Sequence, residues 1–357
     1  TPDQDSGSLR TERLLRLLLQ MRCQVSFIAD NMEFDWCYVQ RLQQVGVEVL
    51  YSPHVHSVWE HLAAQGCPYD LIVLSRHYIA IKYVDAIRRL APKTKILFDT
   101  VDLHYLRLNR QAELDGNRQV RRLAKAAYRD EIYTIRTCDL TLVVSGAEKA
   151  LLAQEAPQAQ VMVLSNVHDP VPWVAPLSGR RDILFVGGFQ HPPNLDAIKW
   201  YGHEIWPQVK RELPEARTLV IGSKMPEEFR RMGEALGLIM VGYVPDLDPY
   251  LNGCRLSISP LRFGAGVKGK VNQSMSYGLP VVATSPSIEG MGLEPGRDIL
   301  VADDADSFAT SLVRLYRDDP LWERLSQGGL ANVEERFSSR VARQALEEIF
   351  KRLGLWV

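Results

Sequence analysis

Residues 255–284, RLSISPLRFGAGVKGKVNQSMSYGLPVVAT, decide the fold of this chain, because they read in turn as a strand, a glycine-rich loop, a helix and a second strand. Residues 256–259 are a short run rich in apolar side chains that ends at Pro260, and residues 281–283 begin the next buried strand. Parallel strands need a crossover connection, which is usually a helix. We therefore expect an α/β fold with a parallel sheet.

The loop of this stretch has the features of a phosphate-binding site. Three glycines, Gly264, Gly266 and Gly269, free its backbone for a tight turn. Lys268 and Lys270 stand among them, just before a helix that we expect from about residue 271 to a stop at Gly278. The N-terminus of a helix is electropositive and its first N–H groups are unpaired, so lysines there suit a phosphate or pyrophosphate. On the loop alone, a glycine-rich surface loop with solvated lysines remains the alternative.

The bulk composition narrows the class of protein. A length of 357 residues indicates two domains, and 46% hydrophobic with 24% charged residues is typical of a soluble globular protein. The net charge of −1 gives no overall field that favours nucleic acid. No apolar run reaches the ~18 residues of a membrane span, which leaves only peripheral membrane association open. The five cysteines are odd in number and have no CxxC spacing, which favours a reducing, cytoplasmic compartment over a zinc site or disulfides.

The first half alternates between strands and helices, which predicts a parallel sheet. It opens on a helix at residues 9–21, where an α/β domain usually opens on a strand. Either that first strand is missing and the chain is one domain of a larger polypeptide, or another segment fills its place. Further along, we expect one long charged helical region at residues 111–136 with a solvated face.

One strand of the first half is followed by several charged residues and a histidine. The strand at residues 96–98 runs into Asp99, Asp102 and His104, and then into Arg107 and Arg110. Ligands of open α/β sheets gather at the carboxyl ends of the strands, so position favours a functional role. The alternative is a capping aspartate beside a solvated histidine.

A connector with Pro170, Pro172 and Pro176 separates the two halves, and the strand–helix pattern restarts after it. We expect an N-terminal domain at residues 1–172, a C-terminal domain at 173–338, and a last helix within 339–357 that returns to the first domain. Within the second half, Asn194 is expected to cap a helix that starts at residue 195.

Five segments of the second half match a known family when taken together and in order. They are FVGGFQHPPNLDAIKW (185–200), LVIGS (219–223), VGYVPDLDPYL (241–251), residues 259–284 of the opening stretch, and IEGMGL (288–293) followed by GRDILVADD (296–304). These segments resemble the C-terminal domain of GT-B-fold glycosyltransferases, specifically the family-4-like retaining enzymes of glycosyl transferases group 1. The first half fits more weakly through DTVDLH (99–104), LVVS (142–145) and VLSNVHD (163–169).

The resemblance implies two Rossmann-like domains that face each other across a cleft, and a transferase that moves a sugar from a nucleotide-diphosphate donor to a hydroxyl of a glycan, lipid-linked or other acceptor. It implies no cofactor and no metal. His104 and Asp102 would stand at the sugar–acceptor junction, and Lys270 and Lys268 would meet the pyrophosphate. The other implied donor-binding residues are Gly187, Gly188, Val244, Pro245, Arg262, Gly266, Gln273 and Glu289.

The chain departs from the family pattern at one position that matters for mechanism. Gln273 stands where the family usually has a glutamate, and the loop carries Arg262 and Lys268 where an earlier glutamate is expected. Glutamine can bond a ribose hydroxyl but supplies no negative charge. Retaining GT-B enzymes generally have no assigned protein nucleophile, so none is expected here.

Three alternatives remain at the level of sequence. Asp246 and Asp248 spell the Asp-X-Asp motif of a metal-dependent transferase, although their place at a helix start favours capping. A dinucleotide-binding oxidoreductase is disfavoured because the loop at Gly187 and Gly188 lacks the G-x-G-x-x-G spacing. A non-catalytic sugar-nucleotide-binding or scaffolding domain is favoured by Gln273 and opposed by the lysine loop.

Overall fold

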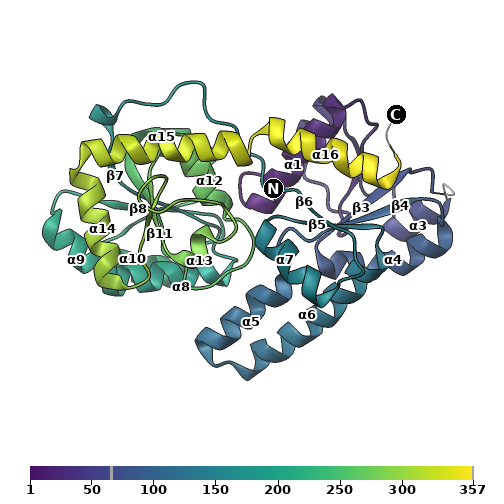
Figure 1. Cartoon of the computed structure of the whole chain (residues 1–357), viewed down its shortest axis with the longest axis horizontal. Coiled ribbons are helices and arrows are strands. Elements are labelled where there is room, and N and C mark those ends of the chain that lie inside the picture. The colour runs from purple at the N-terminus through teal and green to yellow at the C-terminus, as the bar shows by residue number, and fades with distance from the viewer. Residues whose placement is uncertain (65–66, 356–357) are drawn as a thin grey trace. The chain divides into compact units, whose positions relative to one another are not determined.

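The computed structural model describes residues 1–64 and 67–355, and it divides the chain into two α/β units (Figure 1). Unit 1 consists of Thr1–Pro2, Gly7–Ser165 and the chain from Ala342 onward. Unit 2 consists of Asp3–Ser6 and Asn166–Val341. The change of unit after Ser165 comes a little before the domain boundary that the proline connector suggests, and the last helix changes unit within its first turn.

Unit 1 is built on a parallel sheet, as expected from its strand–helix alternation. The strand order is β3 (Leu71–Ser75), β4 (Lys95–Asp99), β5 (Leu140–Val143) and β6 (Val161–Val163). A separate parallel pair joins β1 (Ser26–Ile28) to β2 (Glu48–Leu50). The helices are α1 (Ser6–Gln20), α2 (Trp36–Gln44), α3 (Val58–Ala64), α4 (His77–Leu90), α5 (His104–Asp115), α6 (Arg118–Thr137), α7 (Gly146–Glu155) and α16 (Ser339–Leu353).

The core of unit 1 lies where β4 and β5 meet the helices. Ile96 and Phe98 of β4 are fully buried, and they belong to one apolar cluster with Val84 of α4 and Ile135 of α6. Both faces of these central strands are covered, which explains why β4 and β5 read as continuous apolar runs rather than as alternating ones. The carboxyl end of β4 is thereby held in a rigid frame.

Residues 104–137 form a hairpin of two helices, and not the single helical region at 111–136 that the charge pattern suggested. Gly116 ends α5 with a φ of +64°, a left-handed conformation that favours glycine. The side chain of Asn117 then caps α6 by accepting the N–H groups of Gln119 and Val120 at 2.9 and 3.3 Å. The hairpin projects from unit 1 in Figure 1.

Unit 2 has a six-stranded sheet in which every recorded pairing is parallel. The strand order is β12 (Leu300–Val301), β11 (Val281–Ala283), β10 (Cys254–Ser259), β7 (Arg181–Val186), β8 (Thr218–Ile221) and β9 (Ile239–Gly242). The helices are α8 (Pro192–Trp200), a π-helical turn (Tyr201–Ile205), α9 (Trp206–Glu212), α10 (Glu227–Ala235), α11 (Asp248–Gly253), α12 (Gly269–Ser276), α13 (Ser285–Ile288), α14 (Ala305–Arg317) and α15 (Asp319–Arg336).

The stretch at residues 255–284 has the structure that its sequence predicts. It contains most of β10, then the loop, α12 and β11, and β10 and β11 are adjacent in the sheet. Gly278 ends the helix with a φ of +61°, and its N–H donates to the carbonyl of Met275 at 2.9 Å. The glycine loop therefore connects the carboxyl end of a central strand to the N-terminus of a helix.

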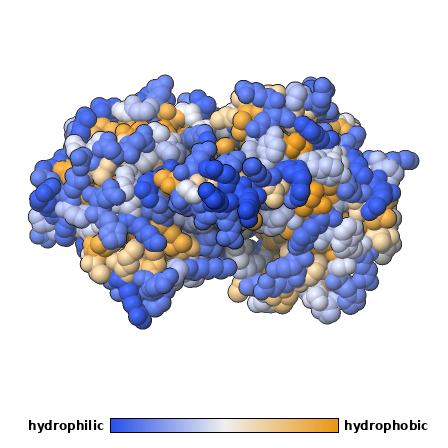
Figure 2. Space-filling view, turned by 90° about the horizontal axis from the view of Figure 1, so that it is seen from below, coloured by the Kyte–Doolittle hydropathy of each residue, from blue (hydrophilic) through white to orange (hydrophobic). Residues whose placement is uncertain are grey.

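No helix in the described part of the chain is long and apolar enough to cross a membrane. The face shown in Figure 2 carries hydrophilic and hydrophobic residues interspersed. From Ala342 onward the last helix groups with unit 1, and the guanidinium of Arg352 donates to the side chain of Gln160 at 2.9 Å.

Candidate functional site

Lys270 lies in the first turn of α12, and its side chain reaches the end of strand β7. Its Nζ donates to Oδ1 of Asn194 at 2.5 Å and stands 4.3 Å from the ring centre of Phe185. A Cβ atom built on Gly187 would lie 2.8 Å from this Nζ and from Cγ and Nδ2 of Asn194, so a side chain at position 187 would displace the lysine or the asparagine. The lysine is therefore half-buried against β7, and it is not a solvated loop residue.

Asn194 connects the lysine to the glycine loop that follows β7. Its Nδ2 donates to the carbonyl oxygen of Gly188 at 2.7 Å, while its Oδ1 accepts from Lys270. The expectation that Asn194 caps a helix from residue 195 is wrong, because α8 already begins at Pro192 with His191 before it. Proline suits the first helical position, so the two prolines of HPPN start the helix earlier. The amide of Asn194 is thus available to bridge two loops.

Lys268 has a different environment from Lys270. It is only 8% exposed, and its Nζ donates to the carbonyl oxygens of Ala265 and Gly266 at 3.2 and 2.6 Å. Gly266 has a φ of +69°, which favours glycine at that position and turns the loop back toward the lysine. Lys268 therefore stabilises the loop and places a second positive charge behind Lys270.

The electrostatics of this loop favour an anion. Burial, and then the neighbouring ammonium of Lys268, lower the pKa of Lys270 to about 7. Its hydrogen-bond acceptor is a neutral amide, which cannot offset the charge as a carboxylate would. An anion bound here would raise the pKa of Lys270 toward its ordinary value. The protonated lysine would in turn bind the anion more tightly.

The other donor-binding candidates follow the carboxyl ends of strands in the same sheet. Gly187 and Gly188 follow β7, Val244 and Pro245 follow β9, and Glu289 follows α13 on the path from β11. Carboxyl ends of parallel strands share one edge of the sheet, and unit 2 therefore brings these positions to the same edge. Val244 and Glu289 are half-buried, and Pro245 is exposed.

Arg262 and Gln273 have surroundings that the sequence did not predict. Arg262 forms an ion pair with Asp196 of α8, with its Nε 2.9 Å from the carboxylate, and its guanidinium lies 6.0 Å from the ring centre of Trp200. Its charge is therefore matched within the protein. Gln273 is half-buried in the middle of α12, one turn beyond Lys270.

The N-terminal residues 3–6 belong to unit 2 and reach the same sheet edge. The carbonyl of Gln4 accepts the hydroxyl of Ser223, which follows β8, at 3.2 Å. A Cβ atom on Gly269, at the start of α12, would lie 2.8 Å from the Cβ of Ser6. This segment therefore packs on the start of α12.

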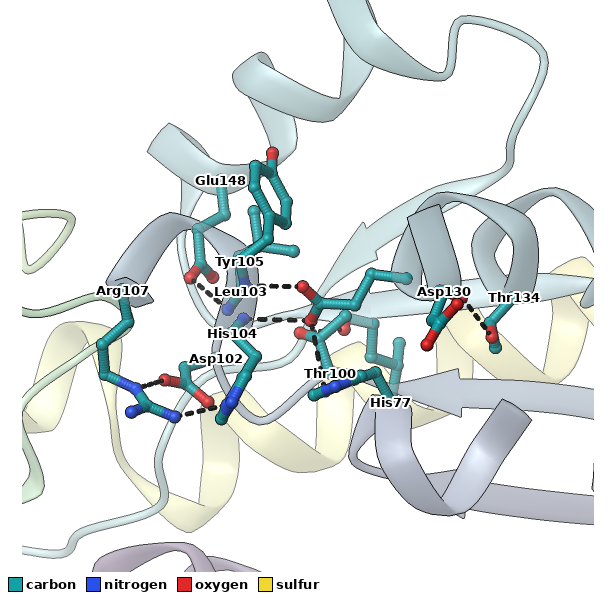
Figure 3. A network of polar contacts seen from close by, with 12 residues as sticks. His77, Thr100, Asp102, Leu103, His104, Tyr105, Arg107, Asp130, Thr134 and Glu148 are labelled. Atoms are coloured by element: carbon teal, nitrogen blue, oxygen red, sulfur yellow. Dashed lines mark hydrogen bonds and ion pairs between the residues drawn. The ribbon is translucent and has the colours of Figure 1, made fainter. Parts of the chain in front are cut away.

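The candidates of unit 1 form a polar network at the carboxyl end of β4 (Figure 3). Arg107 donates from Nε to Asp102 at 2.8 Å, and a second guanidinium N–H contacts Nδ1 of His104. Because a guanidinium only donates, His104 Nδ1 accepts and the ring proton lies on Nε2. Burial, and then Arg107, lower the pKa of His104 to about 4, so this histidine is neutral at pH 7. Burial acts to raise the pKa of Asp102, but Arg107 outweighs it and keeps that pKa low.

Two buried carboxyl groups hold the segment that carries these residues. Glu131 of α6 accepts the N–H groups of His104 and Tyr105 at 3.0 and 2.8 Å. Glu148 of α7 accepts the N–H of Leu103 at 3.3 Å. Burial raises the pKa of Glu131 to about 8, against the opposing effect of the two backbone donors. The start of α5 is therefore held by two carboxyl groups that no local sequence pattern marks.

Asp99 is part of the frame of unit 1. It forms an ion pair with Arg10 of α1 at 2.6 Å, and the two residues are 3% and 2% exposed. Arg10 also donates to the carbonyl of Leu164 after β6 at 2.8 Å. This arginine joins α1 to the ends of two strands, and nothing in its local sequence distinguishes it from the neighbouring Arg13 and Arg16.

The two aspartates of the Asp-X-Asp spelling are engaged in local contacts. Asp246 accepts the N–H of Asp248 at 2.9 Å, and the carboxylate of Asp248 accepts the hydroxyl of Tyr277. Over residues 1–64 and 67–355, no three His, Cys, Asp or Glu side chains are grouped in a way that would hold a metal ion.

Most of unit 2 is similar to a described protein family. Residues 180–318 match the model of the family described as glycosyl transferases group 1. A segment of 178 residues is 27% identical to an uncharacterised 44.6 kDa protein in the cps region of Klebsiella pneumoniae, and it covers 48% of this chain and 45% of that protein. The chain thus spans about half the length of the curated relative that it matches.

Solved structures resemble nearly the whole chain. Sucrose-phosphate synthase from Thermosynechococcus elongatus has a TM-score of 0.73 at 15% identity, over 97% of this chain and 93% of that one. HepE from Anabaena in complex with UDP-glucose has a TM-score of 0.72 at 13% identity, over 98% of each chain. The chain therefore has the GT-B fold, and its residues 180–318 match the model of the glycosyl transferases group 1 family.

Proposed function

We propose that the chain transfers a sugar from a nucleoside-diphosphate donor to a hydroxyl acceptor, without a metal ion and with retention of anomeric configuration. One observation carries the proposal: Lys270, at the start of α12, has its ammonium against the glycine loop after β7, where it donates to the neutral amide of Asn194. An ammonium and the unpaired N–H groups of a helix N-terminus together suit a pyrophosphate. Retention follows from the family resemblance.

Glycosyl transfer from such a donor requires a site that stabilises the leaving diphosphate. Glycosyl transfer passes through an oxocarbenium-like state, as glycoside hydrolysis does. Negative charge grows on the diphosphate as the sugar departs, and preplaced donors are an effective way to stabilise it. Lys270 and the N–H groups of α12 would supply these donors, with Lys268 as a second positive charge close by. The acceptor hydroxyl would lose its proton to the leaving phosphate, as is thought for retaining enzymes of this fold.

The network of unit 1 would serve the sugar side of the reaction. His104 is neutral and keeps a proton on Nε2, so it can donate a hydrogen bond to a sugar oxygen without adding charge. Asp102 would act through Arg107, which holds the imidazole in this tautomer. His104 is the proposed contact, and Asp102 is the residue that positions it.

Donor and acceptor are proposed from what the relatives are described as binding. HepE was determined in complex with UDP-glucose, and pneumococcal GtfA with UDP and GlcNAc. UDP-glucose and UDP-GlcNAc are therefore the first donors to test. The cps-region relative favours a polysaccharide or lipid-linked glycan acceptor. A cytoplasmic location is supported by the five cysteines, all of which are free thiols.

A non-catalytic sugar-nucleotide-binding domain is the second candidate, and Gln273 favours it because a carboxylate usual in the family is replaced by an uncharged amide. Release of free UDP distinguishes the two candidates. We expect the purified chain to release UDP from at least one UDP-sugar when glycan acceptors are present, and to do so equally in EDTA. Thermal stabilisation by UDP with no UDP release from any donor would support the binding domain instead. Loss of turnover in EDTA that Mn²⁺ restores would exclude the metal-independent mechanism.

A further inference from the structure

A cluster of aromatic side chains follows strands β1 and β2, and no step of the proposed reaction uses it. The two strands are parallel, with Ile28 opposite Leu50, so the loops after them leave from the same end of the pair. Phe34, in the first loop, is 44% exposed, and Trp36, at the start of α2, is 61% exposed. The aromatic cluster, as it is called below, consists of Phe34, Trp36, Tyr51 and His54.

The rings of the aromatic cluster pack against one another and leave a surface open to solvent. The ring centre of Phe34 lies 4.7 Å from that of Tyr51 and 6.3 Å from that of Trp36. The imidazole of His54 meets the ring of Tyr51 edge-on at 5.4 Å. Large apolar rings gain free energy when a ligand removes them from water, and contiguous exposed apolar groups mark interaction sites. The cluster therefore has the properties of a binding surface.

The charges around the aromatic cluster indicate the class of its ligand. Residues 23–40 and 42–64, which include both loops, contain no lysine and no arginine. The first loop instead carries three carboxylates, those of Asp30, Glu33 and Asp35. Carboxylates without cations repel the phosphates of a nucleic acid or of an anionic bilayer. They suit a neutral sugar, whose hydroxyls donate to carboxylate oxygens and whose C–H face packs on the negative face of an aromatic ring.

Helix α4 connects the first loop to the network of His104. Asp30 accepts from Nζ of Lys82 at 2.7 Å and from the hydroxyl of Tyr83 at 2.6 Å. Both donors lie in the second turn of α4, and α3 and α4 lie side by side in unit 1 (Figure 1). His77, the first residue of α4, has its ring centre 4.6 Å from that of His104 (Figure 3). The first two turns of α4 therefore join the loop of the aromatic cluster to His104.

Tyr78 lies on the surface along this part of α4. It is 46% exposed, and its ring meets those of His77 and His104 edge-on, at centre distances of 5.4 and 6.5 Å. Lys82 follows Tyr78 by four residues, so the two side chains lie on one face of the helix. His77 and Lys82 are about 7.5 Å apart along the helix axis, which is longer than one sugar ring. A ligand that reaches from His104 to the first loop therefore has more than one sugar.

We propose that the aromatic cluster is an acceptor subsite that binds a neutral sugar ring of a glycan, while a hydroxyl of another sugar of that glycan lies at His104. The assignment of this glycan as the acceptor rests on the proposed sugar transfer. Trp36 would stack on the C–H face of the bound sugar, and the exposed carboxylate of Glu33 would accept from its hydroxyls. The acceptor is then a neutral glycan of at least two sugars.

Saturation-transfer difference nuclear magnetic resonance on the full chain tests the binding without donor or turnover. The probes are glucose and four neutral tetrasaccharides: maltotetraose, cellotetraose, mannotetraose and N-acetylchitotetraose. We expect the wild type to transfer saturation to the ring C–H protons of at least one tetrasaccharide, and to bind it more tightly than glucose. Trp36→Ala should weaken that binding about tenfold, because a large apolar contact is lost. Trp36→Phe keeps a ring and should recover part of the affinity.

Trp173→Ala is the matched control, because Trp173 is 66% exposed and belongs to unit 2. It should bind the tetrasaccharide like wild type, and all three variants should keep the wild-type melting temperature and affinity for UDP. No saturation transfer from the wild type to any tetrasaccharide, or equal loss in Trp36→Ala and Trp173→Ala, would overturn the proposal. So would wild-type binding to phosphatidylglycerol vesicles that Trp36→Ala abolishes, since it would assign the aromatic cluster to a bilayer.

Failure of this subsite and failure of the proposed sugar transfer give different results. Release of UDP by a wild type that binds no tetrasaccharide would refute the subsite and leave the sugar transfer standing. Binding of a tetrasaccharide through Trp36, with no UDP release from any donor, would refute the transfer and leave the aromatic cluster as a glycan-binding site.

Discussion

The ammonium of Lys270 lies 2.5 Å from the side-chain oxygen of Asn194, and the side-chain nitrogen of Asn194 lies 2.7 Å from the carbonyl of Gly188. One amide thus connects the start of α12 to the loop after β7. Both segments follow carboxyl ends of strands in the same sheet, where ligands of α/β folds bind. Asn194 therefore fixes the direction in which the lysine presents its charge.

Replacing Asn194 by alanine removes this connection. We expect Asn194→Ala to weaken UDP binding about tenfold, because a hydrogen bond to a charged group contributes roughly 1.5–3 kcal/mol and the lysine would have to be ordered by the ligand alone. Asn194→Asp would pair the ammonium with a carboxylate and raise the pKa of Lys270. Calorimetric titration with UDP measures the affinity of each variant. If Asn194→Ala bound UDP as tightly as wild type, the amide would have no positioning role.

The pKa of Lys270 near 7 predicts a pH dependence of donor binding. The free site holds the lysine about half-protonated at pH 7, and a bound diphosphate favours the protonated form. Affinity for UDP should therefore fall as the pH rises above 7, by up to about tenfold per pH unit. Titrations from pH 6 to pH 9 check this. Lys270→Gln serves as the control, and a wild-type curve as flat as that of the variant over pH 7–9 would contradict the assignment.

The network around His104 predicts separate effects for changes at His104 and at Arg107. His104→Gln keeps a side-chain N–H donor and should retain more turnover than His104→Ala. Arg107→Leu removes a positive charge beside the imidazole and should raise the pKa of His104 from its value of about 4. Nuclear magnetic resonance titration of the histidine ring protons measures that change. An unchanged His104 titration in Arg107→Leu would show that the contact between the two side chains is absent in solution.

Replacing Arg10 should lower the stability of the fold, because Arg10 is buried with Asp99 in an ion pair. Removing one partner leaves the other charge buried and unpaired, which costs about 3–5 kcal/mol. Arg10→Met should lower the free energy of unfolding by roughly this amount, measured by urea denaturation. The double variant R10M/D99L should recover much of the loss, because an apolar pair of similar volume replaces the ions. A double variant as unstable as the single one would show that the arginine acts through its backbone acceptors.

Periodicity and turn residues predict most of the fold, because they depend on neighbours in the chain. The strand–loop–helix–strand order of residues 255–284 and the stop at Gly278 are of this kind. The break at Gly116 and the start of α8 at Pro192 were missed, because one glycine outweighed the charge pattern and two consecutive prolines outweighed the capping pattern.

The candidate site was predictable in outline and not in detail. The sequence placed Lys268 and Lys270 together, but only the structure separates a buried lysine that stabilises its own loop from one that faces the glycine loop after β7. Arg10, Asn194 and Glu131 act through partners distant in sequence, so no local pattern marks them. Arg262 was selected for its charge, and its pairing with Asp196 depends on the packing of α8.

The most direct test of the central claim is the affinity of Lys270→Ala for UDP, measured by calorimetry with the melting temperature as the folding control. Lys270 is half-buried with a lowered pKa, so its removal relieves a desolvation cost and should leave the fold at least as stable. We predict that Lys270→Ala binds UDP at least about tenfold more weakly and turns over about 10²–10³-fold more slowly, with partial recovery in Lys270→Arg. A folded Lys270→Ala protein that binds UDP as tightly as wild type would show that Lys270 does not bind the diphosphate.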